Sequence, residues 1–171
     1  MDAVRTAMGQ AENAFTTTQL ARYVNTIANS GTCYDLTLVD AITDSTGSVL
    51  EEHEAKVRNT VELPMELWNA GMRGVVQKHT AFQNFTGVTV AGKTGTAQVS
   101  TDIPNHGVFI GYAPYEQPEV SIAVRIANGY TSANAALVAR DVISYYFGIQ
   151  SEEELVTGHS SEASSSLDVN D

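Results

Sequence analysis

The chain has 171 residues, of which 43% are apolar, a composition that favours one folded domain with a hydrophobic core over wholesale disorder. Nine Lys and Arg residues stand against twenty Asp and Glu residues, which gives a net charge of -11. This balance argues against a nucleic-acid partner and against a basic face for an anionic membrane.

The first predicted element is a helix of about three turns. Apolar residues recur at helical spacing from Leu20 to Ala28, and threonines at 16–18 suit the N-cap. The pattern stops at Ser30-Gly31, where a helix commonly ends.

A small β-hairpin is predicted next. Residues 36–39 read L-T-L-V, which is typical of a strand, and Val49 begins the returning strand. The sequence D-S-T-G at 44–47 supplies the turn between them. A second helix is predicted to begin at Pro64 and to run to about Val76.

Strands gather in the second half of the chain. We expect them at residues 88–96, 107–112 and 120–127, and the short connections favour antiparallel neighbours. A last helix is predicted at about 132–147, ended by Gly148. We therefore expect one domain over residues 1–150, followed by an acidic, serine-rich and disordered tail over 151–171.

The sequence contains no pattern typical of a metal site or of a membrane-spanning helix. Cys33 is the single cysteine, so no internal disulfide can form, and no Cys/His set has zinc-ligand spacing. We expect no metal and no cofactor. The sequence has no run of 18 apolar residues, so no membrane contact is expected from this chain itself.

Residues 87–94 match the phosphate-binding pattern G-x-x-x-x-G-K-[ST] at each fixed position. A phosphate loop needs a flexible loop before the lysine and a helix that starts at the lysine. Here the intervening residues are V-T-V-A, which prefer an extended strand, and Gly95 disfavours a helix start. Nucleotide binding therefore stays the less favoured hypothesis.

The alternative is a strand over residues 91–98, with sequence A-G-K-T-G-T-A-Q. A regular pleat would put Lys93 and Gly95 on one face and Thr94 and Thr96 on the other. The triplet K-T-G is one of three signature elements of penicillin-binding proteins and β-lactamases. An exposed strand lysine without a role is the competing interpretation of Lys93.

The eight residues at 91–98 resemble the longer motif of class B penicillin-binding proteins, the monofunctional peptidoglycan transpeptidases. The resemblance continues through residues 106–114, and upstream through 9–10, 16–21 and 27–31. It covers about residues 5–148, and residues 23–29 are most similar to the elongation-type branch.

Two departures from the family pattern do not touch the chemistry directly. Ala11 replaces the second Gly of the family's Gly-Gln-Gly, and Thr17 replaces the usual Pro before the first helix. A third departure affects it, because no Ser-x-x-Lys occurs in the 171 residues and the nucleophile is thus absent from them. Ser132-Ala133-Asn134 fits a Ser-x-Asn element but follows Lys93, whereas the family places that element before the lysine, so we interpret it as a helix start. His106 is interpreted as a polar residue at a strand end.

The resemblance implies an α+β fold, part of the serine β-lactamase and penicillin-binding transpeptidase fold, with an antiparallel sheet flanked by helices. It also implies catalytic or substrate-binding roles for Lys93, Thr94, Gly95 and Thr96. Lys93 would supply a positive field for the substrate carboxylate, and the hydroxyls of Thr94 and Thr96 would bind it. Gly95 would let the substrate backbone approach, and the Thr96 amide would be one of two oxyanion donors.

The function implied is that of a piece of a peptidoglycan D,D-transpeptidase that is inactive alone. The expected partners are peptidoglycan stem peptides and β-lactams, bound by a parent protein at the outer face of the bacterial cytoplasmic membrane. The alternative is a non-catalytic module that self-associates through an exposed sheet edge.

Overall fold

The computed structural model describes residues 4, 6, 14–62, 64–98 and 102–156. The first long helix is α2 (Thr17–Ala28), as predicted. Thr16 is its N-cap, since the Gln19 amide donates to Thr16 Oγ1 at 3.2 Å and the Thr16 amide donates to Gln19 Oε1 at 2.8 Å. This reciprocal pair is a capping box, which fixes the start of the helix.

After α2 the chain makes a long two-stranded excursion. It leaves through β1 (Thr32–Tyr34) and β2 (Ala41–Thr43) and returns through β3 (Val49–Glu52) and β4 (Val57–Thr60). β1 pairs with β4, and β2 pairs with β3, both antiparallel. A hairpin is therefore present, formed by β2 and β3, and its turn lies at 44–47 as expected, since the Asp44 amide donates to the Ser48 carbonyl at 2.9 Å.

The predicted strand at residues 36–39 is wrong, because these residues lie between β1 and β2. Thr37 Oγ1 bonds both the amide and the carbonyl of Val39, at 3.0 and 2.8 Å. Such local bonds between a threonine side chain and the backbone compete with a strand ladder.

The second long helix is α3 (Met65–Lys78), followed by the 3₁₀ turn η1 (Thr80–Phe82). Pro64 precedes its first turn, as the sequence predicts. The last helices are α4 (Ser132–Tyr146), capped by Thr131, and the short α5 (Glu152–Leu155). α5 stands at the start of the segment expected to be disordered, and residues 157–171 of that segment lie outside the described residues.

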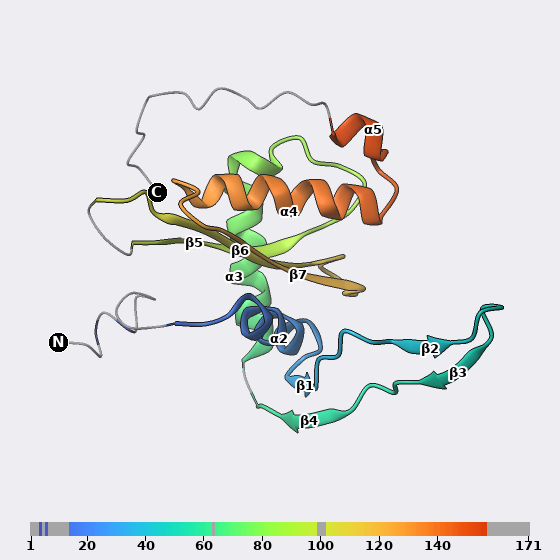
Figure 1. Cartoon of the computed structure of the whole chain (residues 1–171). Helices are drawn as coiled ribbons and strands as arrows, with labels where there is room; N and C mark the ends of the chain where they lie inside the picture. The colour runs from blue at the N-terminus through green and yellow to red at the C-terminus, as the bar shows by residue number, and fades with distance from the viewer. Residues whose placement is uncertain (1–3, 5, 7–13, 63, 99–101, 157–171) are drawn as a thin grey trace.

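The centre of the molecule is an antiparallel sheet in the order β5-β6-β7, formed by β5 (Ala91–Ala97), β6 (His106–Ala113) and β7 (Val120–Ile126). α4 covers one face of this sheet, and α2 covers the other (Figure 1). α3 runs across the sheet, so that Met72 packs with α2 while Val76 packs with α4. The α+β class with helices flanking an antiparallel sheet is confirmed.

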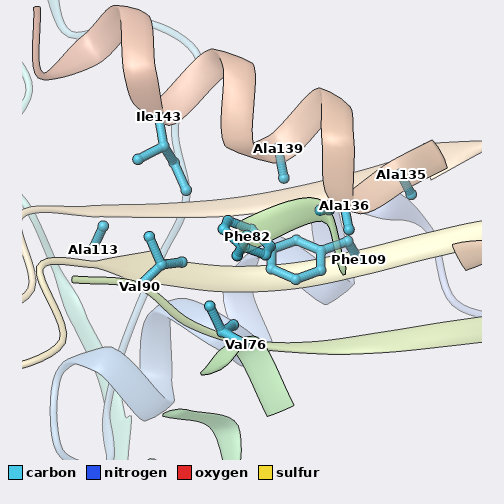
Figure 2. Packing of buried hydrophobic residues seen from close by; sticks show 10 residues of the cluster. Val76, Phe82, Val90, Phe109, Ala113, Ala135, Ala136, Ala139 and Ile143 are labelled. Atoms are coloured by element: carbon cyan, nitrogen blue, oxygen red, sulfur yellow. The ribbon is translucent and has the colours of Figure 1, made fainter. Parts of the chain in front are cut away.

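The core has two parts, one on each face of the sheet. Under α4, the rings of Phe82 and Phe109 pack at 5.6 Å between centroids beneath Ala136 and Ala139 (Figure 2). The small alanines let α4 approach the sheet closely, and their burial adds to the hydrophobic stabilisation. On the other face, Tyr112 is fully buried against α2 and α3. The sheet is thus held rigidly from both sides.

Candidate active site

The predicted motif residues lie in the middle of β5. β5 pairs with β6 from Ala91 to Ala97 without a register shift. Within the part of the chain that the structure describes, no strand pairs with its other edge. The outer edge of β5 therefore has no strand beside it among the described residues, the arrangement that accepts an extended peptide as an added strand.

Regular pairing gives the motif two distinct faces. Gly92 faces the Phe109 ring and the α4 side, whereas Ala91 packs in the cluster beneath α2 and α3. Strand alternation then puts Thr94 and Thr96 on the α4 side and Lys93 and Gly95 on the other. The alternation expected from the sequence is therefore regular.

Lys93 and its neighbours are accessible. The Lys93 side chain is exposed, and its Nζ donates to the Thr94 carbonyl at 2.7 Å. Thr94, Gly95 and Thr96 are each partly exposed. A Cβ added to Gly95 would have its nearest neighbour, Val108 Cβ, at 3.7 Å, an ordinary van der Waals contact, so nothing crowds this position. A ligand backbone has room to approach there.

The segment just before β5 is fixed by residues distant in sequence. Arg73 Nη1 donates to the Val90 carbonyl at 2.9 Å, and the Tyr115 amide donates to the Thr89 carbonyl at 3.0 Å. The Thr89 hydroxyl also donates to Glu116, and this hydrogen bond lowers the pKa of the Glu116 carboxyl. These bonds hold the entry to the motif strand from α3 and from the β6–β7 connection.

The same bonds explain a boundary that the sequence placed too early. Residues 88–90 were predicted as strand, but β5 begins at Ala91. The carbonyls of Thr89 and Val90 bond to Tyr115 and Arg73. Sequence reasoning did not select Arg73, Tyr115 or Glu116, because no local pattern links these residues to the motif.

Three other sequence interpretations are settled by position. β5 remains a strand through Lys93, so the helix start that a phosphate loop requires is not there. Ser132-Ala133-Asn134 forms the first turn of α4, where Asn134 Nδ2 donates to the Gly129 carbonyl at 2.9 Å. His106 lies at the start of β6, and its Nδ1 accepts from the Asn128 amide at 2.9 Å, which gives it a structural role at a turn.

A pocket with a volume of about 540 Å³ lies near the entry to β5, between α3 and the segment that follows η1. Arg73, Phe85, Thr89 and Pro114 are among its lining residues. None of Lys93, Thr94, Gly95 or Thr96 lines it. The motif therefore lies on an open strand edge rather than in this pocket.

Residues 14–62, 64–98 and 102–156 hold neither a metal site nor a membrane-spanning helix. No three His, Cys, Asp or Glu side chains in these ranges are grouped so as to hold a metal ion. None of the helices there has the length and apolar character needed to cross a bilayer.

Residues 2–144 match the family model described as the penicillin binding protein transpeptidase domain. The chain belongs to this family. The match includes β5 and its motif, so the resemblance of residues 91–98 reflects the relationship of most of the chain. The predicted family is confirmed.

Curated relatives of the transpeptidase family agree with this assignment. Penicillin-binding protein 2A of Bacillus subtilis is 31% identical over 172 residues, which cover 86% of this chain and 24% of that protein. Peptidoglycan D,D-transpeptidase MrdA of Haemophilus influenzae is also 31% identical, with 85% of this chain and 26% of that protein covered. The chain thus spans about a quarter of the length of these relatives.

Solved structures of penicillin-binding proteins share the fold. The imipenem acyl-enzyme complex of penicillin-binding protein A from M. tuberculosis has a TM-score of 0.75 and is 29% identical. The alignment covers 85% of this chain and 33% of that one. The described elements therefore correspond to a part of the penicillin-binding transpeptidase fold.

Proposed function

We propose that β5 is the wall of a peptidoglycan D,D-transpeptidase active site that binds the substrate's terminal carboxylate. The observation that carries the proposal is the position of Lys93-Thr94-Gly95-Thr96 on an open outer strand edge. Membership in the transpeptidase family supports it. The substrate class is the stem peptide of peptidoglycan, and β-lactams are the corresponding inhibitors.

Each residue of the motif has a distinct role in this proposal. Lys93 starts on the face opposite Thr94 and Thr96, but its Nζ reaches the Thr94 carbonyl at 2.7 Å. Its ammonium therefore provides positive charge near the edge where the hydroxyls of Thr94 and Thr96 donate hydrogen bonds to the substrate carboxylate. Gly95 leaves room for the substrate backbone beside the strand edge. The Thr96 amide is one donor to the oxyanion that develops during acyl transfer.

The covalent step needs a serine nucleophile activated by a nearby base. Because no Ser-x-x-Lys occurs in the 171 residues, we propose that this chain forms no acyl-enzyme by itself. The nucleophile would come from the part of the transpeptidase domain that the longer relatives carry. The site of action would be the outer face of the bacterial cytoplasmic membrane.

The binding role can be tested on this chain with N-acetyl-D-alanyl-D-alanine, followed by amide NMR shifts. We expect the largest shifts at residues 93–97, because these amides line the proposed wall. Thr94→Val should weaken binding several-fold by removing one hydroxyl donor. The matched control is Thr43→Val, at an exposed position in β2. Shifts confined to other elements, or equal binding by both variants, would contradict the role of β5.

The nucleophile can be tested separately with a fluorescent penicillin. After denaturing electrophoresis, we expect no covalent label on this chain at any incubation time. A stable label that is blocked by excess unlabelled penicillin would show that a nucleophile is present after all.

A second candidate function is self-association, which the open outer edge of β5 favours. Two such edges can pair with each other through backbone hydrogen bonds. Sedimentation equilibrium over a range of concentrations tests this possibility. A monomer at all concentrations would eliminate it without affecting the proposed binding role.

A further inference from the structure

The excursion between α2 and α3 forms one long two-stranded ribbon, which we define as residues 31–61. It is paired at its base through β1 and β4 and near its tip through β2 and β3. The Val61 amide donates to the Gly31 carbonyl at 2.9 Å, and the His53 amide donates to the Asp40 carbonyl at 2.8 Å. At the base, β1 packs on α2. The outer part, with β2 and β3, extends away from the helices and from the central sheet (Figure 1).

The outer part of the ribbon exposes many large apolar side chains. Leu38 is fully exposed, and Leu50 is 67% exposed. The others that are exposed between residues 36 and 50 are Leu36, Val39, Ile42 and Val49. Scattered apolar residues are common on protein surfaces, but six large exposed ones within residues 36–50 are a concentration that is typical of an interaction site.

The same segment carries charge of one sign. Residues 36–55 contain five carboxylates and no Lys or Arg. The carboxylates are those of Asp40, Asp44, Glu51, Glu52 and Glu54. A surface whose apolar side chains are accompanied only by negative charges is complementary to a segment that carries both apolar and basic side chains.

The backbone of the ribbon also has capacity for a third strand. Within the described residues, β2 and β3 pair only with each other, so each has an outer edge without a strand. A two-stranded hairpin is marginally stable in water, and a third strand adds stability. Extended peptides bind such edges through backbone hydrogen bonds.

A second copy of this chain is a poor occupant. Residues 36–55 of two ribbons placed side by side would bring five carboxylates against five others, and each chain has a net charge of -11. Charged edge residues often protect strands from aggregation. Carboxylates along an edge repel another acidic strand, but they do not repel a strand that carries basic side chains.

We propose that the ribbon is a docking site for an extended, lysine- or arginine-bearing segment of another protein, which adds as a strand beside β2 or β3. This binding is separate from the proposed transpeptidase role, since it uses no residue of β5. The exposed apolar side chains contact alternate residues of the incoming strand, and the carboxylates pair with its basic side chains.

The proposal can be tested on the full 171-residue chain with three synthetic peptides of eight residues, blocked at both ends. One alternates Lys and Val, the second alternates Glu and Val, and the third alternates Lys and Pro. We expect only the Lys-Val peptide to slow amide exchange in β2 and β3, and its affinity should fall as salt rises. The Lys-Pro peptide has the same charge, but each of its prolines lacks the N–H that a ladder hydrogen bond needs, so it should add as a strand much less well.

Charge variants sharpen the test. Glu51→Lys combined with Glu52→Lys should raise the dissociation constant of the Lys-Val peptide at least tenfold. The milder pair Glu51→Gln and Glu52→Gln should raise it by a smaller factor while preserving the ribbon. The matched control is Glu152→Lys with Glu153→Lys on α5, which should leave it within twofold.

Three outcomes would overturn the proposal. The first is equal binding of the Lys-Val and Lys-Pro peptides, which would show charge attraction without strand addition. The second is exchange protection elsewhere than in the ribbon. The third is slow amide exchange at the outer edges of both β2 and β3 before any peptide is added. This result would show that the ribbon is already covered. If the chain also sediments as a dimer, the covering element is a second copy.

Discussion

Two glycines of β5 differ in what surrounds them, although they are three residues apart. A Cβ at Gly92 would lie 2.8 Å from the Ile110 carbonyl oxygen and closer still to the Phe109 ring, whereas a Cβ at Gly95 would make only an ordinary contact with Val108 at 3.7 Å. We expect Gly92→Ala to destabilise the fold by about 1–3 kcal/mol through overpacking. Gly95→Ala should change stability far less and should instead hinder ligand approach. Urea unfolding of both variants checks the contrast, and equal losses of stability would contradict it.

Tyr112 gives a second prediction for a single residue. Its hydroxyl is buried without a hydrogen-bond partner among the described residues, and desolvation raises its pKa to about 12. An unpartnered buried hydroxyl is unfavourable, so Tyr112→Phe should stabilise the fold by about 1 kcal/mol at neutral pH. Urea unfolding at pH 7 measures this, and a loss of stability would reveal a partner for the hydroxyl.

The raised pKa of Tyr112 also predicts a pH dependence. In the unfolded chain the phenol ionises near pH 10, about two units below the folded value. The protonated phenol is favoured in the fold relative to the ionised form, so the stabilisation linked to this pKa shift is fully present below pH 10 and is lost as the pH rises towards 12. Urea midpoints measured between pH 9 and 11 should fall more steeply for the parent chain than for Tyr112→Phe. Parallel slopes would contradict the shift.

At the scale of elements, the turn of the ribbon depends on Asp44. Its carboxylate accepts from the Thr46 hydroxyl at 2.7 Å and from the amides of Thr46 and Ser48, and these bonds lower its pKa, the Thr46 hydroxyl most. Asp44→Ala should speed amide exchange in β2 and β3 and leave α4 unchanged. Ser45→Ala is the matched control.

The sign of the Asp44 shift predicts how this turn responds to acid. A carboxyl with a lowered pKa stabilises the folded form above its unfolded pKa of about 4, and the contribution is lost as pH falls through the lowered value. Exchange protection at the Thr46 and Ser48 amides should therefore persist at pH 5 and disappear in stronger acid. Protection that is independent of pH would show that the carboxylate is not the acceptor.

The long elements were predictable because each carries its own periodic pattern. α2, α3, α4 and the three strands of the sheet lie close to where apolar spacing and turn residues place them. The strand at 36–39 failed because Thr37 bonds the Val39 backbone locally, which a hydrophobic pattern does not reveal. The short strands β1 and β4 carry too few residues for such a pattern.

In the molecule as a whole, the motif could be found in the sequence, but the distant residues that hydrogen-bond to the segment just before β5 could not. Lys93-Thr94-Gly95 is contiguous and matches a family motif. Arg73 reaches Val90 across 17 residues, and Thr89 reaches Glu116 across 27. Only the folded chain brings these residues together, so their role in fixing the start of β5 follows from the structure alone.

The central claim is that β5 recognises a terminal carboxylate. Its most direct measurement compares N-acetyl-D-alanyl-D-alanine with its C-terminal amide, using amide NMR shifts of this chain at residues 93–97. We predict that the carboxylate form shifts these amides, that Lys93→Met weakens the effect, and that the amide form binds much more weakly because it lacks the negative charge. Equal shifts with both ligands, or none at β5 with the carboxylate form, would contradict the claim.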